Sequence, residues 1–223
     1  IFLDEINKWL FEYLTFGGYP RIVLENDKQK KKELLKNLFI NYVEKDVVSA
    51  YGNKYKDKAV KLLKSLSFIL GNVINYETLS EHSGLNYREV REITPLLQDS
   101  FVVFIVKPFY KNLMSELRKN PKIYFVDYGL RNYLIGNFEN LDFEKLFENF
   151  VHNELKIKDD VKYWRTTAKT EVDFIVQRGK EIMPVEVKTK AKTTRSLMSF
   201  VESYGVKKAF VANLDEQEIR NVD

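Results

Sequence analysis

Three acidic or basic residues lie on two neighbouring strands of a predicted β-hairpin. Asp173 begins the first alternating apolar run, and Glu186 and Lys188 lie two residues apart on the second. Gly179 lies in the turn between the runs, and residues two apart on one strand point to the same face. The side chains of Asp173 on one strand and of Glu186 and Lys188 on its neighbour can therefore converge within the reach of one divalent ion. The hairpin is therefore the leading candidate for a chemical site.

Carboxylates without histidine or cysteine favour a hard cation. Oxygen ligands alone suit Mg²⁺ or Mn²⁺, and such an ion can polarise a phosphodiester and activate a bound water. A lysine beside it could orient that water or stabilise charge on the phosphate. A further carboxylate would come from the preceding helix, which carries Glu148 and Glu154. These two residues are six apart and do not share a helix face, so spacing alone leaves the choice between them open.

The composition removes several other kinds of site. The chain has 223 residues, no cysteine and two histidines, His82 and His152. Disulfides, thiolate zinc sites and cysteine nucleophiles are excluded, and a histidine-rich metal site is disfavoured. The longest apolar run, residues 101–106, is too short to cross a membrane, and no signal segment opens the sequence. We therefore expect a cytoplasmic protein without a membrane partner.

The first 128 residues are predicted to be mainly helical. Apolar residues recur at helical spacing in residues 2–14 and 20–50, and we expect the lysine run at 28–36 to form a solvated helix face rather than a phosphate-binding patch. Three helices and two apolar strands follow, at residues 57–70, 76–82, 87–98, 101–106 and 122–127. This order is typical of a winged helix-turn-helix, at about residues 57–128.

The third of these helices would be the recognition helix. Asn86 is a plausible N-cap with Glu89 three residues later, which forms a weak capping box. Arg88 and Arg91 could contact nucleic acid, but Glu89 and Glu92 balance their charge. The net charge of +4 is also small. Contact with DNA and contact with another protein therefore both remain open for this part.

Residues 129–223 are predicted to form an α/β domain. A short helix at 129–136 and a longer one from 143 precede strands at 161–165, 171–177, 181–188 and 208–212, with a helix at 194–204 before the last strand. His152 is expected to be a helix-surface or packing residue rather than a ligand, and Trp164 a core residue rather than a stacking platform. After the hairpin come basic residues that could follow a phosphate backbone or be solvated: Lys190, Lys192 and Arg195.

Four stretches of the chain together resemble one family. They are Tyr13–Arg21, Tyr42–Asp46, Pro121–Leu130 and Phe147–Leu155. The chain resembles the C-terminal region of archaeal and bacterial AAA+-type ATPases of uncharacterised function. In these proteins a winged helix precedes a PD-(D/E)XK restriction-endonuclease-like domain. The resemblance covers nearly the whole chain and depends on the combination of motifs.

The resemblance implies an α+β fold with a mixed sheet in the nuclease-like domain, and it assigns roles. Asp173 and Glu186 would bind the metal, Lys188 would be catalytic, and Glu148 is favoured over Glu154 as the helix acid. No G-x-x-x-x-G-K-[ST] loop is present, so we expect no ATP site in this chain and an N-terminal ATPase module as its partner. Val172 stands where such cores usually have proline before the first acid.

Two functions follow as expectations, and a scaffold role is a third, simpler reading. One is Mg²⁺- or Mn²⁺-dependent cleavage of DNA. The other is a non-catalytic DNA- or protein-binding module that docks the ATPase, in an assembly that could be oligomeric.

Overall fold

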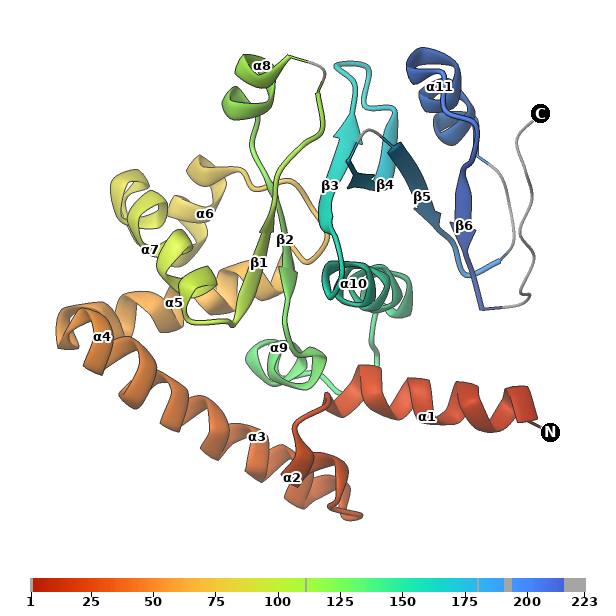
Figure 1. The fold of residues 1–223 in the computed structure, drawn as a ribbon. Coiled ribbons are helices and arrows are strands. Elements are labelled where there is room, and N and C mark those ends of the chain that lie inside the picture. Colours follow the sequence, from red (N-terminus) through yellow and green to blue (C-terminus); the bar gives the residue numbers. More distant parts are fainter. Residues whose placement is uncertain (1, 111, 180, 191–193, 215–223) are drawn as a thin grey trace. The chain divides into compact units, whose positions relative to one another are not determined.

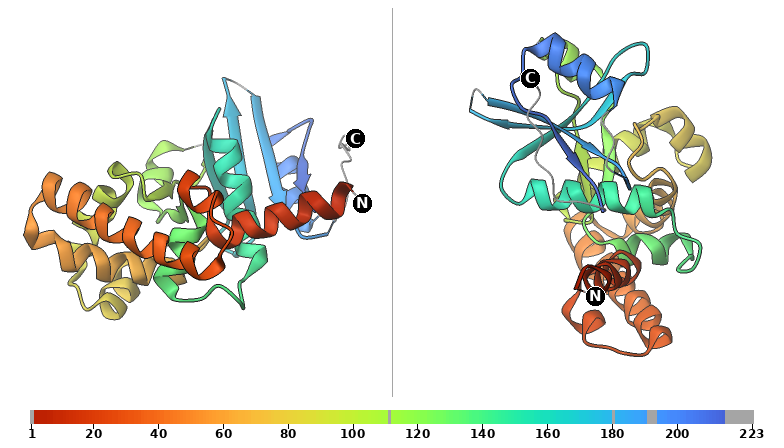
Figure 2. Two further views of the ribbon diagram at one scale, coloured as in Figure 1. Left: turned by 90° about the horizontal axis from the view of Figure 1, so that it is seen from below. Right: turned by 90° about the vertical axis from the view of Figure 1, so that its right-hand side faces the viewer.

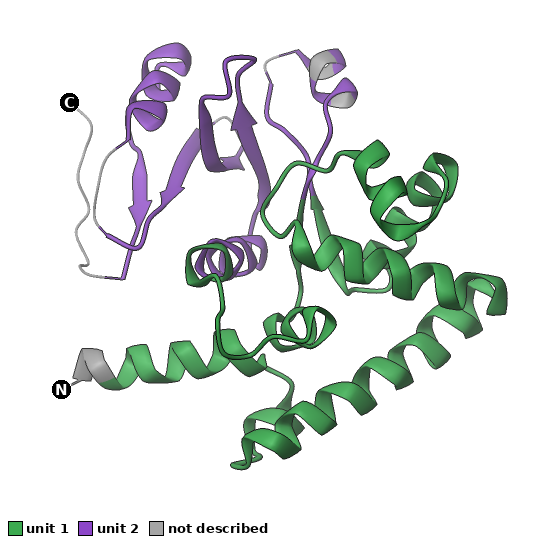
Figure 3. Cartoon of the chain, turned by 180° about the vertical axis from the view of Figure 1, so that it is seen from behind, with its two compact units in different colours: residues 1–105, 123–146 green, residues 106–122, 147–223 purple. Residues whose placement is uncertain are grey.

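The computed structural model describes residues 2–110, 112–179, 181–190 and 194–214. The chain forms two compact units, one of residues 1–105 and 123–146 and the other of residues 106–122 and 147–223 (Figure 3). Helices and two sheets make up the units, so the fold class is α+β. Within the described ranges, the structure has no helix of the length and apolar character needed to cross a membrane.

The first unit consists of helices and one pair of strands (Figure 1). In chain order its elements are α1 (Phe2–Phe16), α2 (Pro20–Val23), α3 (Lys28–Tyr42), the π-helix η1 (Val43–Val48), α4 (Ser49–Tyr51), the 3₁₀-helix η2 (Asn53–Tyr55), α5 (Lys56–Phe68), α6 (Tyr76–Ser83), α7 (Tyr87–Asp99), β1 (Val103–Val106), β2 (Lys122–Phe125) and α9 (Tyr128–Ile135). Strands β1 and β2 pair with each other, and their end residues Val106 and Lys122 are counted with the second unit. The three helices and two strands expected between residues 57 and 128 are thus present in the expected order.

Polar side chains set where several of these helices begin. Asp27 accepts hydrogen bonds from two backbone N–H groups at the start of α3, and Asn75 does the same for α6. At the start of α7, Asn86 and Glu89 form the reciprocal capping box that the sequence indicated. Gly84 ends α6 in the left-handed region at φ +65°, which glycine adopts without steric cost. These local signals explain why the helix boundaries follow the sequence closely.

One residue of the lysine run on α3 is not solvated. Lys31 is 2% exposed, and its ammonium donates to the Ile22 carbonyl oxygen at 2.8 Å. It also pairs with Glu12 at 3.0 Å and lies 5.5 Å from the centre of the Phe16 ring. The expected solvated face therefore fails at this position, where the partners of the Lys31 ammonium compensate for its removal from water.

Helix α9 belongs to the first unit because it packs against α1. The Asn132 side-chain amide donates to the carbonyl oxygens of Leu14 and Thr15 at 2.9 and 3.0 Å. Asp127 caps α9 and accepts the Gly18 N–H at 2.8 Å. The sequence divides the chain after residue 128, whereas the compact units divide it after residues 105, 122 and 146. These α1–α9 contacts hold residues 123–146 with the helices.

The second unit contains a four-stranded mixed sheet. Its elements are α8 (Leu113–Arg118), most of α10 (Phe143–Lys156), β3 (Asp160–Arg165), β4 (Glu171–Arg178), β5 (Glu181–Val187), α11 (Arg195–Tyr204) and β6 (Phe210–Ala212). The strand order is β3-β4-β5-β6. The first three strands are antiparallel neighbours, and β6 runs parallel to β5. Helix α11 makes the crossover that a parallel pair requires.

Helix α11 lies against the sheet (Figure 2), and an apolar cluster holds it there. Leu197 and Phe200 on α11 pack in one cluster with Trp164 of β3 and Val172 of β4. The Trp164 and Phe200 rings meet edge to face with centroids 5.2 Å apart. Phe109, from the segment before β3, joins the same cluster. Trp164 is therefore a core residue, as the sequence indicated.

Candidate functional site

The β4–β5 hairpin brings Asp173 and Glu186 together. The register pairs Phe174 with Val185, so continuing it by one residue sets Asp173 opposite Glu186. The Asp173 carboxylate accepts the Val187 N–H at 2.8 Å, which fixes its side chain across the two strands. The short sequence separation and the tight turn at Gly179, with φ +60°, make this arrangement a local consequence of the sequence.

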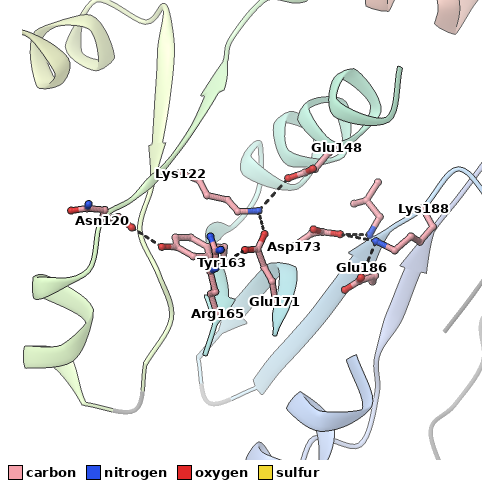
Figure 4. Close-up of polar contacts among 10 residues, drawn as sticks. Asn120, Lys122, Glu148, Tyr163, Arg165, Glu171, Asp173, Glu186 and Lys188 are labelled. Atoms are coloured by element: carbon pink, nitrogen blue, oxygen red, sulfur yellow. Dashed lines mark hydrogen bonds and ion pairs between the residues drawn. The ribbon is translucent and has the colours of Figure 1, made fainter. Parts of the chain in front are cut away.

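Lys188 lies between the two carboxylates (Figure 4). Its Nζ is 2.9 Å from Glu186 Oε1 and 3.9 Å from Asp173 Oδ2. Partial burial acts to lower the pKa of Lys188, but the hydrogen bond to Glu186 and the charges of Asp173, Glu186 and Glu148 outweigh it and raise that pKa. Lys188 therefore stays an ammonium group at neutral pH. It can stabilise negative charge but cannot accept a proton.

The surroundings of Asp173 disfavour the ionised form of its carboxyl group. Burial raises its pKa to about 6, with the charges of Glu148 and Glu186 adding to the effect. The charge of Lys122 and the hydrogen bond from Val187 act in the opposite direction without cancelling it. A carboxyl group poised near neutrality among other acids is a recurrent feature of functional sites.

Glu186 contains a buried carboxylate oxygen, Oε2, that is placed to bind a cation or a water molecule. The residue is 4% exposed, and its Oε1 pairs with Lys188. Its Oε2 has no hydrogen-bond partner among the residues that the structure describes. Such an atom costs free energy unless a cation or water satisfies it. The carboxylates of Asp173 and Glu186 together therefore fit a hard divalent cation.

Lys122 belongs to the same group of charged side chains as Asp173 and Glu186, here called the carboxylate cluster, and the sequence did not predict it. Its side chain is 1% exposed, and its Nζ lies 2.5 Å from Glu171 Oε1 and 3.3 Å from Glu148 Oε1. Burial acts to lower the pKa of Lys122, but the charges of Glu148, Glu171 and Asp173 raise it well above its usual range. Its partners Glu148 and Glu171 lie far along the chain, so no local sequence pattern pointed to these contacts.

Glu148 also lies in the carboxylate cluster, where its carboxylate pairs with Lys122. It is 7% exposed and acts electrostatically on Asp173. Across the described parts of the chain, no three acidic or histidine side chains are arranged so that they could hold a metal ion. Two carboxylates, those of Asp173 and Glu186, are placed to bind an ion, whereas Glu148 faces Lys122.

The other residues considered on α10 lie elsewhere. Glu154 is exposed. His152 is fully buried, with its ring centroid 5.7 Å from that of Phe174. Burial lowers the pKa of His152 to about 4, so the ring is neutral at pH 7. It packs inside the protein and not on the helix surface, which was the other placement that the sequence left open.

The basic residues considered for nucleic-acid contact lie in both units. Arg88 and Arg91 on α7 are exposed, and the Arg91 guanidinium lies 4.5 Å from the centre of the Tyr76 ring. Glu89 on the same helix pairs with Lys58 at 2.6 Å, which neutralises one of the acids that balance the arginines. In the second unit Lys190 and Arg195 are exposed, whereas Lys192 lies outside the described residues.

A separate pocket of about 610 Å³ lies within the first unit. Its lining includes Tyr19 and Arg21, Tyr42 and Asp46, and Leu130, and these belong to three of the four stretches that carry the family resemblance. Its wall contains part of the π-helix η1. These three stretches therefore contribute to a cavity of their own, and Pro121–Leu130 also supplies Lys122 to the carboxylate cluster.

Comparison with known proteins places the chain in a family. Residues 7–141, more than half of the chain, match the family described as "Domain of unknown function (DUF8612)". The chain belongs to this family. Residues 143–222 match a second one, "Domain of unknown function (DUF4143)". The two matched segments meet near residue 142, close to the start of α10.

Two relatives of the chain are uncharacterised proteins. One from Haemophilus influenzae is 26% identical over 188 residues, covering 82% of this chain and 46% of the relative. One from Methanocaldococcus jannaschii is 24% identical over 193 residues, covering 81% of this chain and 42% of the relative. The chain thus spans less than half the length of these curated relatives. No solved structure matches it.

Proposed function

We propose that the second unit cleaves DNA phosphodiester bonds with the help of Mg²⁺ or Mn²⁺. The observation that carries the proposal is the convergence of Asp173 and Glu186 on Lys188, whose ammonium lies 3.9 Å from Asp173 and 2.9 Å from Glu186. The buried Oε2 of Glu186, which has no hydrogen-bond partner among the described residues, supports a cation at this position.

The architecture around the hairpin supports a restriction-endonuclease-like core. A mixed four-stranded sheet contains the hairpin, and the preceding helix α10 carries Glu148. These are the parts that the resemblance to PD-(D/E)XK domains requires. The order α5-α6-α7-β1-β2 likewise supports a winged helix in the first unit, with Arg88 exposed on its third helix.

In this proposal each residue has a distinct task. Asp173 and Glu186 would hold the ion, which supplies a water of lowered pKa and polarises the phosphate. Lys188, which remains protonated, stabilises the negative charge that develops on the phosphate. The exposed Lys190 and Arg195 lie a few residues along the chain and contact the DNA backbone.

The test is cleavage of plasmid and linear DNA with Mg²⁺, Mn²⁺ or a chelator. Asp173→Asn and Lys188→Met should each abolish cleavage. Lys156→Met is the matched control because its side chain is 38% exposed, against 39% for Lys188, and it pairs with an acid, Asp160, at 3.1 Å. It should leave cleavage unchanged. Metal-dependent cleavage that survives both site changes would refute the proposal.

A non-catalytic DNA- or protein-binding module is the second candidate, and one observation favours it. Lys122 and Lys188 already neutralise part of the carboxylate cluster, and the described residues contain no three-acid metal site. Such a module would bind DNA in a salt-dependent manner without cutting it, and Asp173→Asn would leave binding unchanged. A gel-shift series across salt concentrations, run beside the cleavage assay, separates the two.

We extend the proposal to the whole protein on the basis of the family resemblance alone. The chain would be the nucleic-acid-directed part of a cytoplasmic AAA+-type ATPase, with the ATPase module as its partner. ATP hydrolysis by the full-length protein, stimulated by DNA only when residues 1–223 are present, would support this extension.

A further inference from the structure

Lys122 is a buried cation that holds two of the four carboxylates in the cluster. Its Nζ contacts Glu171 Oε1 at 2.5 Å and Glu148 Oε1 at 3.3 Å. The Tyr163 ring covers it, with the ring centre 5.5 Å from Nζ, and its side chain is 1% exposed. An ammonium group this deeply enclosed keeps its partners fixed, because moving either carboxylate away would break a buried ion pair.

The other oxygen of Glu171 also has a cation nearby. Arg165 Nε lies 3.4 Å from Glu171 Oε2. By contrast, Glu186 Oε2 has no hydrogen-bond partner among the described residues, and Asp173 lies 3.9 Å from Lys188. The cluster is therefore divided into a neutralised half, Glu148 and Glu171, and a half that still has capacity for a cation, Asp173 and Glu186.

The charge balance points the same way. Four carboxylates, those of Glu148, Glu171, Asp173 and Glu186, face three cations, Lys122, Lys188 and Arg165. One negative unit remains, in the half formed by Asp173 and Glu186, and it can attract a cation. Without Lys122 the cluster would carry two negative units, and Glu148 would lose its ion pair with Lys122, which favours a second ion.

We propose that Lys122 is a built-in cation that limits this cluster to one divalent ion, held by Asp173 and Glu186. Lys122 keeps Glu148 and Glu171 away from that ion, so Glu148 acts on Asp173 through its charge and is not itself a ligand. The inference rests on the proposed metal dependence and specifies its stoichiometry. Lys122 is thus a positioning residue, because it acts through the carboxylates that it holds.

The experiment counts Mn²⁺ ions bound to the 223-residue protein, using the electron paramagnetic resonance signal of free Mn²⁺. The wild-type protein should bind one ion, and Asp173→Asn should bind none. Lys122→Met should bind two, and adding Glu148→Gln to it should restore one. Lys162→Met is the matched control, because it removes a lysine that pairs with Glu116 at 2.5 Å elsewhere in the same unit. It should still bind one ion.

The outcomes separate the inference from the proposed function. Two ions on the wild-type protein, or one on folded Lys122→Met, would overturn the role of Lys122 and leave a metal site intact. No ion on the wild-type protein would overturn the proposed metal dependence itself. If Lys122→Met does not fold, Glu148→Gln decides: one bound ion supports the inference, and loss of binding as complete as in Asp173→Asn overturns it.

Discussion

At the scale of single residues, the carboxylate cluster stores unfavourable free energy. Asp173 is largely buried beside Glu148 and Glu186, and its pKa is raised to about 6 from 3.8. A shift of this size corresponds to a cost of about 3 kcal/mol for the ionised form relative to the unfolded chain. Glu186 adds a buried oxygen without a hydrogen-bond partner among the described residues. Groups arranged at such a cost indicate a site shaped for binding rather than for stability.

Replacing this carboxylate should therefore stabilise the protein. Because the folded state binds the proton of Asp173 more tightly than the unfolded state, stability falls as pH rises from about 4 to about 6. Asp173→Asn removes the charge and keeps an oxygen that can accept the Val187 N–H. We expect the free energy of unfolding at pH 8, without divalent ions, to rise by about 1–3 kcal/mol. Near pH 4 the gain should vanish.

Urea unfolding at the two pH values measures this effect. Asp160→Asn is the control, because Asp160 is 68% exposed and such changes usually stay within about 0.5 kcal/mol. A mutant that is less stable than the wild-type protein at pH 8 would mean that Asp173 is held by favourable contacts, and the stored free energy would then be absent.

At the scale of elements, two glycine-bearing segments control how α1 meets α9. A Cβ atom at Gly129 would lie 2.0 Å from the Phe16 carbonyl oxygen and 2.3 Å from its carbon. These are backbone atoms, which cannot move aside as a flexible side chain can. The two segments belong to the stretches 13–21 and 121–130, so part of the family resemblance reflects this close packing.

Gly129→Ala should destabilise the first unit by about 3 kcal/mol or more. Helix propensity alone would predict the opposite sign, a gain of about 1 kcal/mol. Gly136→Ala is the comparison, because Gly136 has open space around it but a φ of +70°, and it should cost only about 1–2 kcal/mol. Thermal unfolding followed by circular dichroism ranks the two variants. If Gly129→Ala proved the milder change, α1 and α9 would not be in this close contact.

The sequence predicted those structural features that depend on residues close together in the chain. The capping box at Asn86 and the β4–β5 hairpin arise from residues that lie close together in the chain, so local sequence patterns predicted both. The contacts of Lys122 with Glu148, 26 residues away, and with Glu171 depend on how distant segments fold together. No local pattern contains that information. No element was predicted between residues 106 and 122, because helix α8 has only six residues and is too short to show a helical period.

At the scale of the whole molecule, the second unit is built from two separate stretches of chain. Residues 106–122 belong to it although they precede residues 123–146 of the first unit. Phe109 packs into the cluster beneath α11, and the Phe109 N–H donates to the Tyr163 carbonyl oxygen at 2.6 Å. The Tyr163 hydroxyl donates to the carbonyl oxygen of Asn120 at 2.5 Å. The stretch thus supplies core packing, backbone hydrogen bonds and the cation Lys122.

A fragment that begins at residue 129 should therefore fail to fold, although sequence patterns favour that boundary. It would lose Phe109 from the core and leave Glu148 and Glu171 without the Lys122 ammonium, a loss of about 3–5 kcal/mol for a buried pair alone. A fragment of residues 106–223 retains all these contacts. We expect a cooperative thermal transition, followed by circular dichroism, for 106–223 and none for 129–223. Phe109→Ala in the longer fragment should cost about 3–5 kcal/mol. Equal stability of the two fragments would show that residues 106–122 are dispensable, and with them the place of Lys122 in the site.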